Sequence, residues 1–190
     1  MRNVLPRKAH LIPAEATRVF KGVIFDVYQW QQEMFDGSFE TFEMLKRPDT
    51  IKVIAVKDDK IVILQEEQPA YGSFCGVPGG RHDFDDESEL DAAKREVAEE
   101  SGFTFSTWKL LDVWQSQPKI DHFVYYFLAT DFEKEVERHL DPGEKIDVQL
   151  LDFDSVKEIV KSGQGRDIGE KFFAEVDSLE ELLALPEYIP

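Results

Sequence analysis

The segment GGRHDFDDESELDAAKREVAEESGF, Gly79–Phe103, is the most informative part of this 190-residue chain, because it joins a glycine pair and a polar loop to a helix that bears several glutamates. Ser88 follows turn-type residues and predicts the helix start, with Asp91 three positions later. Gly102 predicts the helix end. Four residues lie about one turn apart on one side of this helix. They are Leu90, Ala93, Val97 and Ser101.

Three glutamates on this helix predict a site for a divalent cation. Glu96 and Glu100 are four positions apart and project from one face, with Glu99 beside them. Like charges at this spacing destabilise an isolated helix by about 0.2–0.5 kcal/mol per pair, and the helix dipole disfavours anions near the C-terminus. Bound Mg²⁺, which prefers carboxylate oxygens, would reverse that penalty. The alternative interpretation is a solvated charged face.

The order of residues in this stretch resembles the signature of the Nudix hydrolases. Glu87 is followed by seven residues and then by Arg95-Glu96-Val97-x-Glu99-Glu100-x-Gly102-Phe103. Those enzymes use a divalent metal to hydrolyse nucleoside diphosphates linked to another group. The resemblance implies that Glu96, Glu99, Glu100 and the Gly79 carbonyl hold Mg²⁺ or Mn²⁺. We expect Arg95 to reach back to Glu87 or to a loop carbonyl and so hold the loop on the helix.

The loop before the helix departs from the family pattern. The pattern has five residues between its second glycine and its first glutamate, whereas Gly80 and Glu87 are separated by the six residues Arg81–Asp86. Asp86 stands where a glycine is usual, so the end of the loop is conformationally less permissive. The longer loop affects the positions expected for the Gly79 carbonyl and Glu87, but it leaves the ligands on the helix unaffected.

Composition narrows the classes of function. The formal net charge is −17 and the pI is about 4.6, which argues against a nonspecific nucleic-acid or anionic-membrane surface. A small phosphorylated ligand stays possible because metal ions neutralise charge locally. Cys75, the single cysteine, forbids an internal disulfide and is expected to be a small buried residue. Without a long apolar run or an apolar core in Met1–Pro13, neither a membrane span nor a signal peptide is expected, which leaves a cytoplasmic protein as the default.

Along the chain, strand and helix patterns predict an α/β fold, an α/β/α sandwich with a mixed sheet. The predicted strands are Arg18–Gln32, Ser38–Leu45, Ile51–Val56, Ile61–Gln65, Tyr71–Val77, Thr104–Val113, His122–Thr130 and Lys145–Phe153. The predicted helices after the first one are Ser155–Ser162 and Ile168–Leu183, with Asp131–Leu140 as a loop or short helix and Ala184–Pro190 as a tail. The Nudix resemblance implies the same architecture from about Arg18 to Ser162.

The N-terminal segment Phe20–Val27 resembles the start of the ADP-ribose pyrophosphatases, and Pro118, sixteen residues after Gly102, has a spacing similar to that branch. In that branch this antiparallel hairpin pairs two subunits and helps to build the substrate pocket. The resemblance therefore implies a homodimer. It also implies a division into residues 1–48, the N-terminal hairpin, and residues 49–190, the core with C-terminal helices.

Other parts of the chain depart from that branch. The segment Gln65–Pro69 lacks an expected arginine. Asp121 is the candidate for the acidic substrate contact of that branch, although its register is shifted. Arg47 and Lys119 are candidate contacts for phosphate or ribose, with plain surface cations as the alternative. Two aromatic residues on one face of the first strand, opposite to Phe25, could stack on a base, a contact worth about 1–3 kcal/mol. They are Tyr28 and Trp30, and their alternative role is in the core or a dimer interface.

The predicted reaction is Mg²⁺-dependent hydrolysis of the pyrophosphate bond in ADP-ribose or a related nucleoside diphosphate sugar. Its products are a nucleoside monophosphate and a sugar phosphate. By similarity to that branch, Glu144 in the loop Asp141–Glu144 is the candidate base, with an ordinary loop carboxylate as the alternative. Two other functions stay open: hydrolysis of a nucleoside triphosphate or dinucleotide, and a noncatalytic domain that senses a nucleotide.

Overall fold

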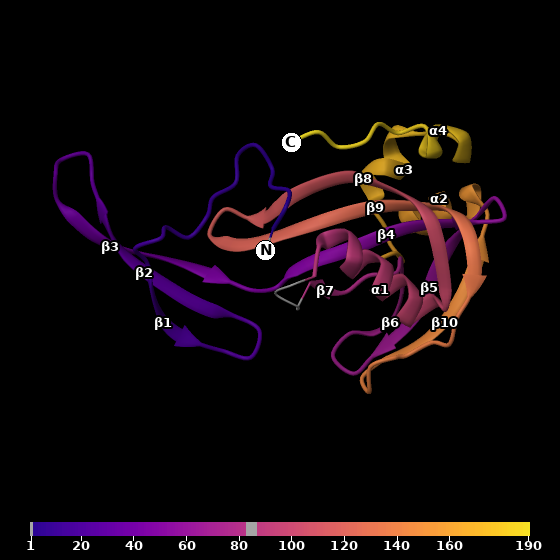
Figure 1. The fold of residues 1–190 in the computed structure, drawn as a ribbon, viewed down its shortest axis with the longest axis horizontal. Coiled ribbons are helices and arrows are strands. Elements are labelled where there is room, and N and C mark those ends of the chain that lie inside the picture. Colours follow the sequence, from indigo (N-terminus) through magenta and orange to yellow (C-terminus); the bar gives the residue numbers. More distant parts are fainter. Residues whose placement is uncertain (1, 83–86) are drawn as a thin grey trace.

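The computed structural model describes residues 2–82 and 87–190 (Figure 1). The helices are α1 (Glu89–Ser101), α2 (Phe153–Ser162), α3 (Glu170–Glu175) and α4 (Leu179–Leu183). The strands are β1 (Thr17–Lys21), β2 (Asp26–Glu33), β3 (Phe39–Lys46), β4 (Asp49–Lys57), β5 (Lys60–Gln68), β6 (Gly72–Gly76), β7 (Arg81–His82), β8 (Phe103–Gln117), β9 (Ile120–Glu135) and β10 (Lys145–Leu151). The departure predicted at Asp86 lies outside the described residues.

Within the described residues the strands form one mixed sheet. Its order is β1-β2-β3-β9-β4-β5-β10, with β6 on β5, β7 on β4 and β8 on β9. The centre is the parallel pair β4 and β9, in which Ile51–Ala55 lies opposite Tyr125–Ala129. β4 and β5 pair only beside their turn, at Val56 with Ile61 and Lys57 with Lys60, so the two strands diverge and the sheet curls (Figure 1). The divergence opens the space in which the site lies.

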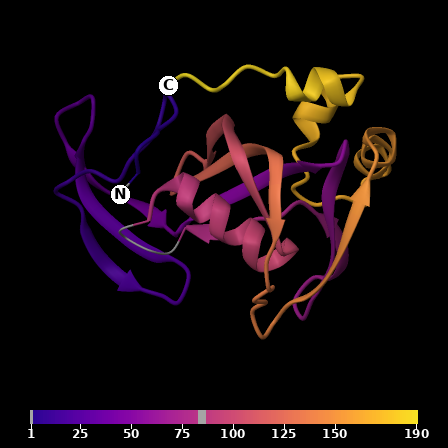
Figure 2. The ribbon, with the colours of Figure 1, turned by 45° about the vertical axis from the view of Figure 1, so that its right-hand side comes forward.

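Helices cover both faces of this sheet, which confirms the predicted α/β/α sandwich (Figure 2). On one face Ala92, Ala93 and Val97 of α1 pack with apolar residues of β4, β8 and β9. On the other face α2, α3 and α4 bury a cluster that includes Phe153 and Phe173. Each face therefore has its own apolar core, and the sheet between them is held from both sides.

Helix α1 begins and ends where its local residues predict. The Ser88 hydroxyl accepts a hydrogen bond from the Asp91 N–H at 3.0 Å, a cap typically worth about 1 kcal/mol. Gly102 adopts a left-handed conformation with φ of 76° and donates its N–H to the Ala98 carbonyl at 3.1 Å. These two residues fix the length of the helix, and with it the position of its glutamates.

Near the N-terminus the structure corrects the prediction of one strand over Arg18–Gln32. β1 and β2 are separate antiparallel strands. The Gly22 N–H donates to the Phe25 carbonyl at 3.0 Å and to Asp26 Oδ1 at 3.2 Å, which closes a turn. A Cβ at Gly22 would collide with that carbonyl oxygen, so glycine is needed here. Phe25 therefore lies in a turn, and its predicted orientation on a strand was wrong.

Three further predictions need correction. The segment expected as a loop or short helix at Asp131–Leu140 continues β9 to Glu135, because pairing with β8 across Phe105 and Phe132 extends the ladder. The single helix expected over Ile168–Leu183 is broken into α3 and α4, and Ser178 caps the second. Cys75 is only partly buried, and its thiol donates to Gln65 Oε1 at 3.1 Å.

Both ends of the chain are held against the core. Arg2 contacts Asp49 and Asp121, which ties the N-terminal segment to β4 and β9. The Lys109 ammonium donates to the carbonyls of Leu183 and Leu185, and the tail then runs back beside β8, where the Tyr188 N–H donates to the Leu110 carbonyl at 2.7 Å (Figure 1). The division at residue 48 falls between β3 and β4 and stays a prediction. No helix in the described part of the chain is long and apolar enough to cross a membrane.

Candidate active site

A cleft of about 800 Å³ opens beside α1 and between the diverging strands. One wall carries the glutamates of α1, and the other is formed by residues of β4, β5 and β9 and by the loops around Tyr71, Asp141 and Arg166. Its charged lining residues are Arg47, Lys52, Glu66, Arg81, Arg95, Glu96, Glu99, Glu100, Asp141, Glu144, Arg166 and Asp167. The cleft is therefore rich in both carboxylates and cations.

The glycine pair brings the loop before α1 into close contact with both the sheet and the helix. Gly79 has φ of 153°, and a Cβ there would collide with the Ile51 carbonyl oxygen. A Cβ at Gly80 would lie 2.5 Å from Glu96 Oε2. The Gly79 N–H donates to Glu100 Oε2 at 2.7 Å. The absence of side chains at these two positions thus lets backbone atoms line the cleft next to the glutamates.

Two of the helix glutamates are buried carboxylates with perturbed acidity. Burial raises the pKa of Glu96 to about 7, although the charge and hydrogen bond of Arg95 oppose the shift. Burial raises the pKa of Glu100 well above its ordinary value, against the opposing charge of Lys52 and the hydrogen bond from Gly79. Such shifts concentrate at functional sites, because a site that binds or moves charge often holds charge away from water.

Arg95 joins the helix glutamates to the loop, which is the contact predicted from the sequence. Its guanidinium donates to both Glu87 oxygens at 2.9 and 3.2 Å, to Glu96 Oε1 at 2.8 Å and to Glu99 Oε2 at 3.0 Å. It also donates to the Arg81 carbonyl at 3.1 Å. Burial acts to lower the pKa of Arg95, but these carboxylates raise it above its ordinary value. The guanidinium therefore stays charged and fixes the glutamates in orientation.

The helix glutamates have the chemistry of a divalent-metal site, although they are not gathered as ligands around one point. Among residues 2–82 and 87–190, no three His, Cys, Asp or Glu side chains converge with metal-ligand geometry. Arg95 instead holds Glu96 and Glu99. Oxygen donors suit Mg²⁺ and Mn²⁺, and the raised pKa values of Glu96 and Glu100 indicate negative charge that a cation would stabilise. The donor set therefore fits such an ion.

Sequence reasoning missed three ionisable residues on the opposite wall, which are Lys52, Glu66 and His122. Glu66 of β5 is buried and accepts from Gln68 Nε2 at 3.1 Å; its burial raises its pKa, while Lys52 opposes the shift. His122 of β9 contacts Thr50 Oγ1 at 2.9 Å, and burial, assisted by Arg47, lowers its pKa to about 4. An ionisable residue inside an apolar strand is the pattern that could have revealed all three.

The other predicted site residues fall into two groups. Glu144 and Arg47 line the cleft, and Tyr28 lines a second cavity that adjoins it. Glu144 accepts from the Asp141 N–H at 3.1 Å, and burial raises its pKa. Three predicted substrate contacts line neither cavity: Trp30 packs on Phe42, Lys119 lies 5.8 Å from the same ring, and Asp121 is paired with Arg2.

Comparison with known proteins gives a matching family model, a relative and a solved structure. The family model of the NUDIX domain matches residues 46–175. The chain is 26% identical over 170 residues to a Bacillus subtilis (strain 168) protein named ADP-ribose pyrophosphatase, with 87% of this chain and 91% of that protein covered. A solved crystal structure described as an ADP compounds hydrolase matches with a TM-score of 0.60 at 19% identity, covering 78% of this chain and 81% of that one. The structural match shows likeness of fold.

Proposed function

Since the chain belongs to the Nudix family, we propose that it hydrolyses the pyrophosphate bond of ADP-ribose or a related nucleoside diphosphate sugar with the help of a divalent cation. The products would be a nucleoside monophosphate and a sugar phosphate. The observation that carries the proposal is the wall of buried glutamates on α1, held beside the Gly79–Gly80 loop in a cleft. The similarity to a protein named ADP-ribose pyrophosphatase supports this choice of substrate.

The residues of the acidic wall have separable roles. Glu96, Glu99 and Glu100, with the Gly79 carbonyl, would hold Mg²⁺ or Mn²⁺. Such an ion, when bound, supplies charge neutralisation at the phosphate oxygens and increases the acidity of water. Arg95 is a positioning residue, because it ties Glu96 and Glu99 to the loop through Glu87.

The remaining roles belong to residues outside the helix. Glu144 would accept the proton of the attacking water, since burial raises its pKa and so its basicity. Arg47 would bind a phosphate or ribose oxygen, and Tyr28 would contact the nucleoside from the adjoining cavity. Trp30, Lys119 and Asp121 stay predicted substrate contacts.

The N-terminal strands would pair two copies of the chain. Large apolar side chains are exposed on β1, β3 and the adjoining turns, and their burial against a second copy would be favourable. They are Val19, Phe20, Val23, Phe35, Phe39 and Phe42. Sedimentation equilibrium should give a dimer mass for the native protein and a monomer mass for Phe20→Asp. A monomeric native protein would refute the dimer and leave the hydrolase proposal intact.

Product analysis tests the reaction directly. The protein would be incubated with Mg²⁺ and, separately, with ADP-ribose, other nucleotide sugars, dinucleotides and nucleoside triphosphates. AMP and ribose 5-phosphate should appear from ADP-ribose and disappear when the ion is chelated. Glu100→Gln should abolish the products, whereas Glu133→Gln, which makes the same change at an exposed position of β9, should not.

The alternatives give different products. Release of phosphate or pyrophosphate from triphosphates alone would establish another Nudix substrate class. Binding of ADP-ribose without metal-dependent turnover would favour a sensor domain and overturn the proposal.

A further inference from the structure

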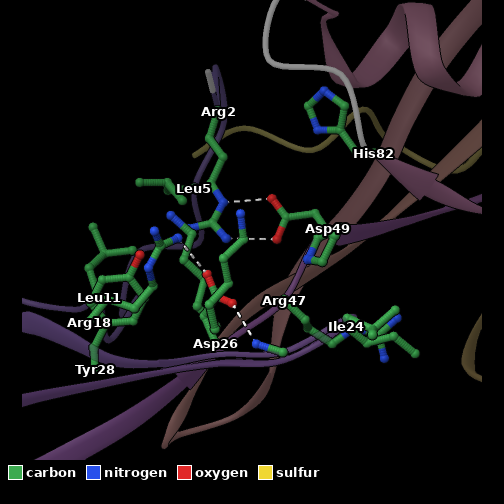
Figure 3. A pocket seen from close by; sticks show the side chains of 15 residues that line it. Arg2, Leu5, Leu11, Arg18, Ile24, Asp26, Tyr28, Arg47, Asp49 and His82 are labelled. Carbon is green, nitrogen blue, oxygen red and sulfur yellow. Dashed lines mark hydrogen bonds and ion pairs between the residues drawn. The ribbon is translucent and has the colours of Figure 1, made fainter.

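A cavity of about 720 Å³ lies next to the cleft, between the N-terminal segment, strands β1–β3 and the start of β4 (Figure 3). Its lining carries five Lys and Arg side chains but only two carboxylates. The cations are Arg2, Arg18, Lys21, Lys46 and Arg47, and the carboxylates are Asp26 and Asp49. The lining therefore carries a net positive charge, whereas the whole chain has a formal net charge of −17.

The two carboxylates are already occupied by two of the cations. Arg2 donates to both oxygens of Asp49 at 2.6 and 2.8 Å (Figure 3). Arg2 also contacts Asp121. Arg18 donates to Asp26 at 3.0 Å (Figure 3). The excess positive charge of the cavity therefore comes from its other cations.

Three cations remain without a carboxylate partner among the residues that the structure describes: Lys21, Lys46 and Arg47. Lys21 and Lys46 flank Asp26 at the same register on neighbouring strands, so all three side chains share one face. Both lysines are exposed and open to a ligand from solvent. The Arg47 Nε is buried and has no hydrogen-bond partner in the described chain, which is costly for a charged donor.

Arg47 also connects the cavity to the cleft. Arg47 and Ile24 line both spaces. A substrate whose pyrophosphate lies at the glutamate wall would therefore meet the cationic lining at its other end. The cations of the cavity would attract an additional phosphate at that end, while the pyrophosphate lies at the cation held by the glutamates.

We propose that this cavity, which we call the cationic cavity, binds a phosphomonoester group at the distal end of the substrate. The preferred substrates are then nucleoside diphosphate compounds that carry an additional phosphate on the nucleoside. A phosphomonoester carries nearly two negative charges and three acceptor oxygens, which suit two lysines and an arginine. The proposal rests on the proposed pyrophosphatase function.

A pair of substrates that differ only in that phosphate tests the inference. We would measure kcat/KM with Mg²⁺ for ADP-ribose and for its adenosine 2′-phosphate derivative. The native protein should prefer the phosphorylated compound by about tenfold or more, the effect of one charge-assisted hydrogen bond. Lys21→Ala and Lys46→Ala should each lower that ratio by about tenfold. Lys134→Ala, an exposed β9 position that lines neither cavity, should leave the ratio unchanged.

A ratio near one in the native protein, or a ratio that the two lysine variants leave unchanged, would overturn the inference. If neither compound is hydrolysed, the pyrophosphatase proposal fails by itself, and equilibrium binding decides about the cavity. Calorimetric titration with adenosine 2′,5′-bisphosphate and with AMP should then show about tenfold tighter binding of the bisphosphate, lost in Lys46→Ala. Equal affinities would refute the cationic cavity as a phosphate site. Circular dichroism would confirm that each variant is folded.

Discussion

The glutamate wall of the cleft and the cationic cavity adjoin each other, yet they are built in different ways. The wall comes from one continuous stretch, Gly79–Gly102, in which a glycine turn and a capped helix set the positions of the carboxylates. The cavity collects its charges from the N-terminal segment, three strands and the start of a fourth. Arg47 lies between the two.

The two sites therefore affect the stability of the folded protein in opposite directions. The wall gathers buried negative charge that opposes folding until a cation is present. The cationic cavity is stabilised by ion pairs, because Arg2 contacts Asp49 and Asp121, which are distant from it in the sequence. Substitutions in the wall should therefore lower activity with little loss of stability, whereas removal of Arg2 should lower stability.

The largest expected effect belongs to Glu96→Gln. Loss of a carboxylate that is proposed to hold the divalent cation should lower kcat by about 10³-fold. The protein should keep its fold, since glutamine is nearly isosteric and accepts the hydrogen bond from Arg95. Steady-state hydrolysis of ADP-ribose and circular dichroism check the two halves of this prediction. Loss of both fold and activity would show that the wall is structural.

Glu144→Gln asks whether the distant wall of the cleft takes part in the reaction. A general base typically contributes about 10²–10⁴-fold, so kcat should fall by about 10²-fold with little change in KM. The pH dependence of kcat should also lose its acidic limb, because that limb would report the Glu144 pKa, which burial raises. An unchanged kcat would show that the Glu144 carboxylate takes no part in the reaction.

Arg2→Ala tests the anchoring of the cationic cavity. It would leave Asp49 and Asp121, both buried, without their cation. Breaking a fully buried pair costs about 3–5 kcal/mol, and the partial exposure of Arg2 should reduce the loss to about 2 kcal/mol. Urea unfolding would measure the change, with Arg7→Ala, an exposed position on the same segment, as the control. Equal stability of the two variants would contradict the anchoring role.

The smallest expected effect is a gain of stability in Glu100→Gln without divalent metal. Burial raises the folded-state pKa of Glu100 above its ordinary value of 4.5. The contribution of the Glu100 carboxyl to stability is therefore complete below about pH 4.5, where the group is protonated. This contribution is lost as the pH rises through the folded-state pKa. At about pH 8 in chelator, the variant should be more stable than the native protein by about 1–2 kcal/mol.

The same experiment at about pH 5 should show a smaller difference, because protonation removes the buried charge of the native glutamate. Exposed Glu180→Gln, as a control, should show no such pH dependence. If Glu100→Gln is less stable than the native protein at both pH values, the buried charge of Glu100 does not destabilise the fold.

The length of α1 and the link between Arg95 and Glu87 could be predicted because caps and helical spacing act within a few residues. The break between β1 and β2 could not, because it depends on a turn in which Gly22 meets Phe25. The extension of β9 to Glu135 also escaped prediction, since a charged segment became a strand only through pairing with β8.

Local residue patterns were enough to predict the α/β/α architecture, the helix with its glutamates and the resemblance to Nudix hydrolases, because each depends on residues that are close together in the chain. In contrast, folding alone brings Glu66, Lys52 and His122 to the same cleft and places Arg47 between two cavities. Arg2 and Asp121, for example, meet across 119 positions of chain. Sheet pairing and burial create such neighbours, and no short window of residues contains the information that specifies them.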